Sequence, residues 1–317
     1  MDRTNHTTAR PAAGVAVVLA FAALAAVTIG ACGGSGGTAE GTGRATVMAT
    51  TPLLGDLVTR VGGDRVRVEV LIPRGADPHD FEPSAAQAAR LRDATLVVAN
   101  GLGLEERLGA TLESAASDGT RVVELGPQLD PLQSPDTDEP DPHVWLDPDR
   151  MARAAALVAD ELARTTGLDR SGFETNAAAY AADARAAAVE AAAILDSVPV
   201  PQRLLVTNHD ALEYFADRFG FRVVGTIIPG GSTLAEPSAA DLRDLVASIR
   251  ANGVTAIFSE STSSSKLADT LARELGTRIR IVELSTDTLG APGSDAATYP
   301  GLITTTARLI ADGLLGR

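Results

Sequence analysis

The sequence is poor in cysteine and histidine and has few basic side chains. Its single cysteine, Cys32, excludes both a fold held together by disulfide bonds and a zinc site built from several cysteines. The 27 basic residues stand against 41 acidic ones, which gives a formal net charge of -14 at pH 7. Because such a charge repels phosphate backbones, we do not expect a nucleic-acid-binding protein. The length of 317 residues suffices for two lobes, each with its own core.

The N-terminal residues 1–31 predict a lipoprotein signal peptide. A basic stretch precedes an uncharged apolar run, Ala12–Ile29, which is long enough to span a membrane as a helix. The small residues just before Cys32 resemble a bacterial lipobox, so we expect cleavage after residue 31 and acylation of Cys32. An uncleaved signal anchor is the alternative. The glycine-rich residues 32–44 suit a flexible tether that holds the rest of the chain at the extracytoplasmic face of the membrane.

Short β-branched runs alternate with helical patterns from residue 45 onward, which favours parallel α/β architecture. The predicted strands are Ala45–Ala49, Val66–Ile72, Thr95–Ala99, Arg121–Glu124, Arg203–Thr207, Arg222–Thr226, Val254–Ser259 and Arg278–Leu284. The predicted helices between them are Pro52–Val61, Ser84–Arg92, Leu104–Ser117, Ala211–Phe219, Ser238–Asn252 and Lys266–Leu275. We therefore expect two similar α/β lobes with parallel sheets, an N-terminal lobe at 45–168 and a C-terminal lobe at 199–317.

The alanine-rich residues 169–198 predict one long helix between the lobes. Apolar residues recur there every three or four positions, and no proline interrupts the pattern before Pro199. At about 1.5 Å per residue such a helix spans on the order of 40 Å, enough to run along both lobes as a rigid strut. An ordinary helix followed by a loop is the alternative.

Residues 126–142 differ from the rest of the chain because they combine five prolines with several carboxylates. Neither a helix nor a strand tolerates this proline density, so we expect an exposed acidic loop.

Three histidines, His79, His143 and His209, remain when His6 of the predicted signal peptide is set aside, and all three are expected in loops. A loop histidine is most often an ordinary surface side chain. However, His209 follows Thr207-Asn208 at the end of a predicted strand, and Asp287 follows another strand. Loops at the carboxyl ends of parallel strands converge on one crevice, so these side chains are candidates for a shared site. Three imidazoles and one carboxylate form a tetrahedral set that suits Zn²⁺ and is tolerable for Mn²⁺.

Five segments resemble, in this order, the motifs of the zinc/manganese solute-binding proteins of bacterial metal ABC importers. They are Pro78-His79-Asp80-Phe81-Glu82-Pro83-Ser84, Asn100-Gly101-Leu102-Gly103-Leu104-Glu105, Asp141-Pro142-His143-Val144-Trp145-Leu146-Asp147-Pro148, Asn208-His209-Asp210-Ala211-Leu212-Glu213-Tyr214-Phe215 and Asp287-Thr288-Leu289-Gly290. The resemblance runs from about residue 45 to the C-terminus. It implies two α/β lobes joined by a long helix, with one metal ion in the cleft between them.

The resemblance also implies the ligands, the cargo and the partners. His79 and His143 are the expected ligands from the N-terminal lobe, and His209 and Asp287 those from the C-terminal lobe. The implied function is capture of Zn²⁺ and delivery to a membrane permease driven by a cytoplasmic ATPase, by a lipid-anchored monomer that is not an enzyme. Because the rigid strut resists hinge bending, we expect metal release through local movement of the C-terminal ligands.

Several alternatives stay open at this stage. Manganese is the other possible cargo, although manganese receptors of this family tend to have glutamate where His209 stands, and nitrogen donors favour zinc. Glu260 follows a predicted strand and is a candidate to support or replace Asp287. A secreted zinc hydrolase, with Glu260 or Asp287 as general base, and a surface adhesin are rivals from other classes.

The neighbours of the candidate ligands have two possible roles each. Asp77, Asp141, Asp147 and Asp210 are placed to orient imidazoles or to cap turns and helices, and capping is favoured for Asp147 ahead of a helix from Asp149. Trp145, the only tryptophan, either shields the cleft or packs in the core of the lobe.

Overall fold

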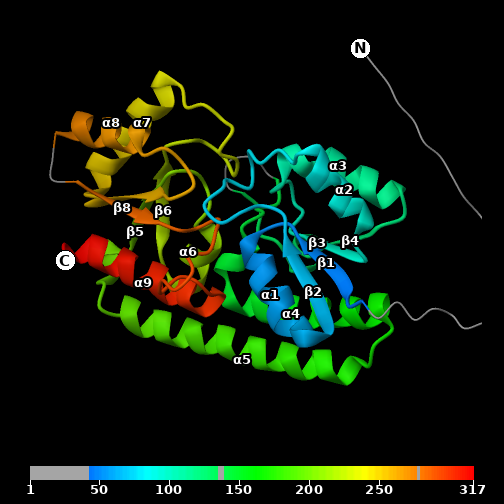
Figure 1. Cartoon of the computed structure of the whole chain (residues 1–317). Helices are drawn as coiled ribbons and strands as arrows, with labels where there is room; N and C mark the ends of the chain where they lie inside the picture. The colour runs from blue at the N-terminus through cyan, green and yellow to red at the C-terminus, as the bar shows by residue number, and fades with distance from the viewer. Residues whose placement is uncertain (1–42, 135–138, 277–278) are drawn as a thin grey trace, which may run out of the picture. The chain divides into compact units, whose positions relative to one another are not determined.

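Two parallel β-sheets organise the chain from residue 43 onward (Figure 1). The computed structural model describes residues 43–134, 139–276 and 279–317, so the predicted signal peptide and the tether up to residue 42 lie outside the described residues. None of the helices in these described segments is both long enough and apolar enough to cross a membrane.

Each sheet has four strands, and all neighbouring strands run parallel. The N-terminal sheet has the order β2-β1-β3-β4 and is formed by β1 Ala45–Ala49, β2 Val66–Val70, β3 Leu96–Ala99 and β4 Arg121–Glu124. The C-terminal sheet has the equivalent order β6-β5-β7-β8 and is formed by β5 Leu204–Thr207, β6 Arg222–Thr226, β7 Ala256–Glu260 and β8 Arg280–Leu284. The prediction of two similar parallel α/β lobes is confirmed.

Helices cover both faces of each sheet. The N-terminal lobe has α1 Pro52–Gly62, α2 Ala85–Asp93, α3 Gly109–Ser117 and α4 Pro148–Thr166, and the C-terminal lobe has α6 Glu213–Phe219, α7 Ala239–Asn252, α8 Lys266–Leu275 and α9 Tyr299–Leu315. Short 3-10 turns are η1 Gly63–Arg65, η2 Glu106–Leu108, η3 Gly126–Gln128, η4 Val144–Leu146 and η5 Val200–Gln202.

Successive strand residues pack into different cores because their side chains alternate between the two faces of the sheet. In β1, Val47 and Ala49 join the largest apolar cluster, whereas Met48 joins a cluster under α2 and α3. In the other lobe, Phe258 joins the largest cluster and Ile257 a cluster under α7 and α8. The largest cluster contains residues of both lobes, so the lobes share one continuous core.

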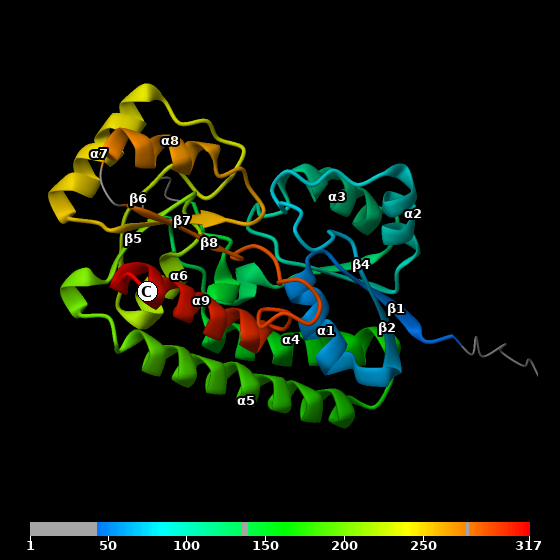
Figure 2. The same cartoon turned by 60° about the vertical axis from the view of Figure 1, so that its left-hand side comes forward.

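The helix α5, Arg170–Leu195, runs beneath both lobes, as Figures 1 and 2 show from two directions. It packs against α1 and α4 of the N-terminal lobe and against α9 of the C-terminal lobe. Its buried side is formed mainly by alanines together with Phe173 and Tyr180. Small side chains allow the neighbouring helices to approach closely, which makes α5 a rigid connection. The prediction of one long helix between the lobes is confirmed.

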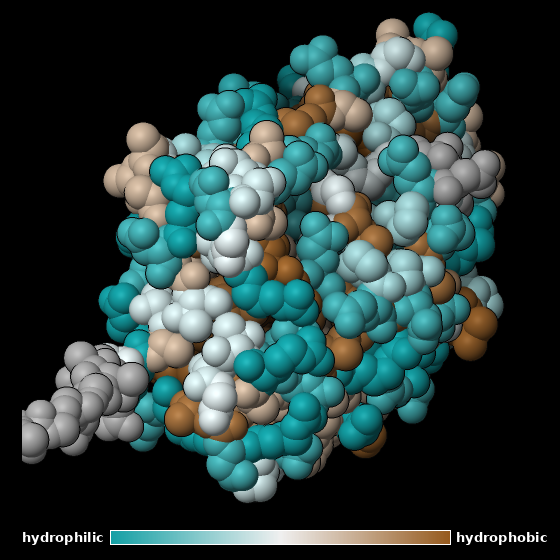
Figure 3. Space-filling model, turned by 90° about the vertical axis from the view of Figure 1, so that its right-hand side faces the viewer, coloured by the Kyte–Doolittle hydropathy of each residue, from teal (hydrophilic) through white to brown (hydrophobic). Residues whose placement is uncertain are grey.

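The molecular surface is largely polar on the side shown in Figure 3, where apolar side chains appear in small separate groups. Within the described residues, the exposed large hydrophobic side chains are far apart in the sequence: Val70, Leu168, Val189, Val200 and Leu234.

Two local features differ from the predicted ones. The expected helix Leu104–Ser117 begins later, as η2 followed directly by α3, and the chain just before it has positive φ at residues 101–103. The helix α9 was not predicted, because its sequence contains Pro300, Gly301 and three consecutive threonines. Thr298 caps its first turn, Pro300 lies in that turn where proline is tolerated, and the inner side of α9 joins the shared core.

The prediction of an exposed acidic loop at 126–142 is only partly right for the residues that the structure describes. Asp130 and Glu139 are exposed, but Asp141 is 1% exposed. The backbone of Asp141 bonds to Leu132, and Gln133 pairs with Pro140 in an antiparallel bridge. The segment therefore folds back on itself and brings its last carboxylate into the interior.

We predict that proline in the middle of α5 destabilises the whole fold. Ala182 is exposed, so Ala182→Pro removes no packing but breaks the helix at a cost of about 3 kcal/mol. The matched variant Ala182→Gly should cost only about 1 kcal/mol. Denaturant unfolding measures both, and equal costs would contradict a continuous strut.

Candidate metal centre

The four expected ligands lie at loop positions supplied by both lobes. His79 lies in the segment after β2, and His143 is the residue before η4. His209 lies two residues after β5, and Asp287 follows β8. All four side chains are at most 1% exposed, although histidine and aspartate are polar. Their burial results from the way the two lobes meet.

The structure brings the four side chains together in one cluster. One nitrogen from each histidine and one oxygen from Asp287 all lie within 4.8 Å of one another. The Nε2 atoms of His143 and His209 are 3.0 Å apart, and the carboxylate oxygens of Asp287 lie 3.9 Å and 3.8 Å from them. Both oxygens of Asp287 and both ring nitrogens of His79 are buried without a hydrogen-bond partner. Buried polar atoms in this state indicate that the cluster accommodates a further group.

A carboxylate lies beside the Nδ1 atom of each of the three histidines. Asp141 is 2.7 Å from His143 and Glu260 is 2.8 Å from His209. Glu106 is 3.7 Å from His79. Carboxylates in this position orient an imidazole and increase the basicity of its other nitrogen, as they do in many metal sites. Glu260 thus contacts the side of His209 that faces away from His143.

The sequence did not point to Glu106. It is the second of two adjacent glutamates, and the first, Glu105, is buried and binds Thr50 and the backbone of Asn100 and Gly101. Two successive residues of this turn point in different directions, so Glu105 fixes the backbone while Glu106 faces His79. The path of the η2 turn therefore determines which of the two glutamates faces His79.

The other aspartates that the sequence singled out have different partners. Asp77 accepts the backbone N–H of His79 at 2.9 Å, and Asp210 accepts the hydroxyl of Ser134 at 3.2 Å. Asp147 caps α4 by accepting the N–H of Asp149, as predicted. Among these four aspartates, Asp141 is the one for which the structure gives a contact with a histidine ring.

Trp145 fulfils both of its possible roles. It is buried in the shared core, and its ring lies edge-on to His143 at a centroid distance of 5.2 Å. Its indole N–H donates to the carbonyl of Thr286, the residue before Asp287. It therefore excludes water from His143 and connects the two lobes beside the cluster.

Burial governs the ionisation of the cluster. Loss of solvation raises the pKa of Asp287 to about 7 and that of Glu260 to about 8. The same loss lowers the pKa of His143 and of His209. Both imidazoles are thus neutral and offer lone pairs, while a divalent cation among them would favour the ionised form of the carboxylates.

His79 and Asp141 show how partners modify this effect. Burial lowers the pKa of His79, but its contact with Glu106 and the charges of Asp287 and Asp77 outweigh burial, so the pKa is raised overall. Burial raises the pKa of Asp141 to about 7, although the backbone N–H of His143 opposes the shift.

The donor set fits a metal ion that accepts nitrogen ligands. Three imidazole nitrogens and one carboxylate oxygen can surround a zinc ion tetrahedrally, and such a closed set leaves no position for a reactive water. The site is thus suited to holding a metal ion rather than to metal-assisted hydrolysis.

Comparison with known proteins identifies the family. Residues 47–313 match the family described as zinc-uptake complex component A periplasmic, ZnuA. The chain therefore belongs to the ZnuA family of metal solute-binding proteins of ABC importers, which are binding proteins and not enzymes.

Relatives named for manganese and relatives named for zinc are about equally similar to this chain in sequence. The chain is 29% identical over 284 residues to the manganese-binding lipoprotein MntA of Halalkalibacterium halodurans, covering 89% of this chain and 92% of that protein. It is 30% identical over 269 residues to the zinc-binding protein TroA of Treponema pallidum, covering 83% and 86%. The solved structure of the Treponema protein superposes with a TM-score of 0.80 at 29% identity, over 86% of this chain and 99% of that one. These similarities establish the family and fold, but they do not distinguish zinc from manganese.

We predict that Tyr214→Phe destabilises the wall of the site. The Tyr214 hydroxyl donates to the carbonyl of Asp141 at 2.7 Å and accepts the N–H of Leu132 at 2.9 Å. Phenylalanine leaves both backbone groups without this partner, so the free energy of unfolding should fall by about 1–3 kcal/mol. Denaturant unfolding of the metal-free protein tests this, and a change below about 0.5 kcal/mol would show that water replaces the hydroxyl.

Proposed function

We propose that the chain is an extracytoplasmic receptor that captures Zn²⁺ and delivers it to an ABC permease driven by a cytoplasmic ATPase. His79, His143, His209 and Asp287 are the proposed ligands. The observation that carries the proposal is the convergence of three imidazoles and one carboxylate, one pair from each lobe, at a fully buried point. Membership of the ZnuA family supports delivery to an importer.

The donor types support zinc as the cargo. Nitrogen ligands suit zinc, whereas manganese prefers oxygen ligands. His209 is decisive, because it makes the donor set three nitrogens to one oxygen. Manganese remains the alternative cargo, since relatives of similar distance are named for manganese as well as for zinc.

Glu260 supports His209 in this proposal and does not replace Asp287. Its carboxylate lies at Nδ1 of His209, whereas Asp287 approaches Nε2 of His209 and of His143. A general-base role for either carboxylate would need a water on the metal, which four protein ligands exclude. Cell adhesion, the other rival function, has no support in the geometry of the site.

We further propose that the mature chain begins at Cys32, which carries the lipid anchor, and acts as a monomer. Residues 32–44 then form the tether, 45–168 and 199–317 the two lobes, and 169–198 the linking helix. Relatives named as lipoproteins support the anchor. No fixed position relative to the membrane is required for capture of a freely diffusing ion.

Removal of one proposed ligand should abolish tight zinc binding. We expect one Zn²⁺ per metal-stripped chain of residues 32–317, not displaced by equimolar Mn²⁺. His209→Ala and Asp287→Ala should each weaken binding by more than about 3 kcal/mol, roughly a hundredfold or more, because each opens a closed site. Competition titration against a chromophoric chelator measures this.

The matched control is Asp295→Ala. Asp295 is an exposed carboxylate eight residues beyond Asp287 that pairs with Arg308. Its removal deletes one carboxylate, as Asp287→Ala does, without opening the cluster. Unchanged zinc affinity in the two ligand variants would refute the ligand set. Displacement of zinc by manganese in the unaltered protein would instead transfer the proposal to a manganese receptor.

Replacement of Cys32 should abolish lipid attachment. In a bacterium that acylates lipoproteins, we expect the wild-type chain to begin at a lipid-modified residue 32, and Cys32→Ser to carry no lipid and to keep residues 1–31. Mass spectrometry of the intact chains gives both readouts, and zinc affinity should stay the same. A wild-type chain that keeps residues 1–31 and carries no lipid would favour the uncleaved signal anchor.

A further inference from the structure

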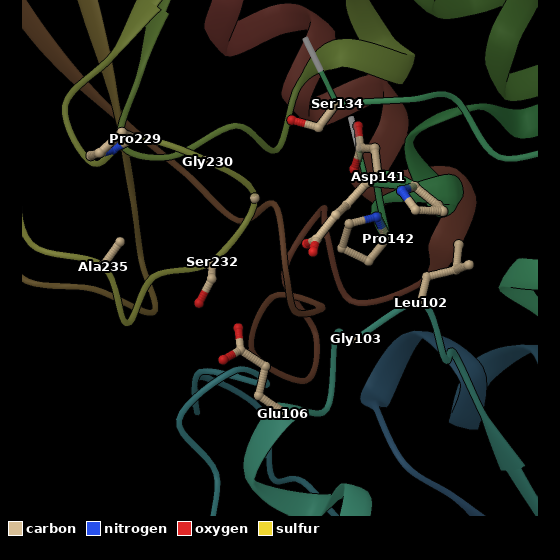
Figure 4. Close-up of a pocket in the computed structure, with 13 residues that line it drawn as sticks. Leu102, Gly103, Glu106, Ser134, Asp141, Pro142, Pro229, Gly230, Ser232 and Ala235 are labelled. Atoms are coloured by element: carbon tan, nitrogen blue, oxygen red, sulfur yellow. The ribbon is translucent and has the colours of Figure 1, made fainter. Parts of the chain in front are cut away.

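A surface pocket of about 390 Å³ lies directly outside the cluster (Figure 4). Glu106 and Leu102 line it from the N-terminal lobe, and Pro229, Gly231 and Ser232 line it from the C-terminal lobe. Asp141 and Pro142, which precede His143, form a further part of the wall. The pocket therefore opens where both lobes and the segment that carries His143 meet.

Two carboxylates connect this pocket to the histidines. Glu106 lines the pocket and approaches Nδ1 of His79, while Asp141 lines it and binds Nδ1 of His143. The second carboxylate oxygen of Asp141 is buried and has no hydrogen-bond partner. A cation in the pocket would thus meet Glu106, which is 37% exposed, while the carboxylate of Asp141 is buried in the pocket wall.

The support of His79 is looser than that of the other two histidines. Its carboxylate stands 3.7 Å away, against 2.7 Å for His143 and 2.8 Å for His209. The side chain of Glu106 is also 37% exposed, whereas those of Asp141 and Glu260 are 1% and 3% exposed. His79 can therefore move with less disruption of its surroundings than His143 or His209.

The loop 229–235 of the C-terminal lobe contacts two residues that neighbour His79. The Ser232 hydroxyl hydrogen-bonds to the carboxylate of Glu106, and Figure 4 shows the two side chains pointing toward each other. The Thr233 hydroxyl donates to Asp77 at 2.6 Å, and Asp77 in turn accepts the backbone N–H of His79. Separation of this loop from the N-terminal lobe would uncover His79 without any movement of α5 or of the shared core.

We propose that the metal ion enters and leaves through this pocket and that Glu106 is the positioning residue for the exchange. The proposal rests on the proposed function. A hydrated divalent cation first meets Glu106, and His79 closes over it last, held by Glu106 and by the loop 229–235. In release, His79 leaves first. This assigns the local movement to a ligand of the N-terminal lobe, in contrast to the C-terminal ligands that the sequence favoured.

A side chain that fills the pocket tests the route. A Cβ atom at Gly231 would meet only Pro142 Cδ, at an ordinary contact distance of 3.7 Å, and the backbone there does not need glycine. Gly231→Leu should slow both association and dissociation of Zn²⁺ by about tenfold and leave the affinity nearly unchanged, as expected of an obstructed passage. Stopped-flow mixing of the full mature chain with zinc, and of the zinc-loaded chain with excess chelator, measures the two rates.

The control for this variant is Gly109→Leu, at a position where an added Cβ meets no heavy atom within 4 Å and which does not line the pocket. It should exchange zinc at the wild-type rates. If Gly231→Leu binds one zinc and also exchanges it at the wild-type rates, the route is wrong.

Removal of the Glu106 charge tests the positioning role, also if Gly231→Leu fails to fold. Glu106→Gln should raise the zinc dissociation rate about tenfold, the usual size of an effect on a group that orients a metal ligand, without lowering the unfolding midpoint of the metal-free protein. Glu190→Gln makes the same charge change on the exposed side of α5 and should leave the dissociation rate unchanged. Equal dissociation rates in the two variants would overturn the proposal.

The outcome also separates this inference from the function on which it rests. A wild-type chain that binds zinc, with Glu106→Gln indistinguishable from Glu190→Gln, refutes the exchange route alone. A wild-type chain that binds manganese and no zinc is measured with manganese, with the same expected changes in rate. A wild-type chain that binds neither metal refutes both proposals.

Discussion

The structure depends on the burial of polar atoms that have no partner within the protein. Asp287 and His79 present such atoms to the centre of the cluster, where His143 and His209 also aim Nε2. Leaving them unpaired in the interior is costly, because burial removes the hydrogen bonds that water would otherwise make. A single divalent cation at this point would satisfy all four side chains at once and favour the ionised carboxylate. Since each lobe supplies only two of the four, the site exists only while the lobes stay together.

The frame around the site keeps the lobes together. One apolar core extends through both lobes, and α5 packs against helices of each. Beside the cluster, Trp145 and Tyr299 link the lobes, as the indole binds Thr286 and the Tyr299 hydroxyl binds the carbonyl of Trp145. Wide hinge opening would break this core, whereas rearrangement of an exposed loop would not. A receptor of this kind is therefore expected to exchange its ion through local movement at the surface.

The sequence predicted much of this fold, because short buried strands and amphipathic helices leave strong periodic patterns. Strands β1, β4 and β6 have the predicted bounds, and the four residues of the cluster were selected from loop positions and family motifs. The sequence did not predict how the side chains of Asp141 and Glu106 are oriented. The inward position of Asp141 depends on the pairing of residues 132–133 with residues 140–141, and the orientation of Glu106 depends on a turn of three residues. Neither leaves a periodic pattern, since both result from tertiary packing rather than local preference.

The proposed function requires three imidazoles and one carboxylate to hold a single zinc ion in a closed site. X-ray absorption spectroscopy of the zinc-loaded mature chain tests it most directly, because it counts ligands and identifies imidazole by its outer-shell scattering. Four nitrogen and oxygen neighbours at about 2.0–2.1 Å, three of them imidazoles, and no sulfur are expected. Five or six neighbours, or fewer than three imidazoles, would contradict it.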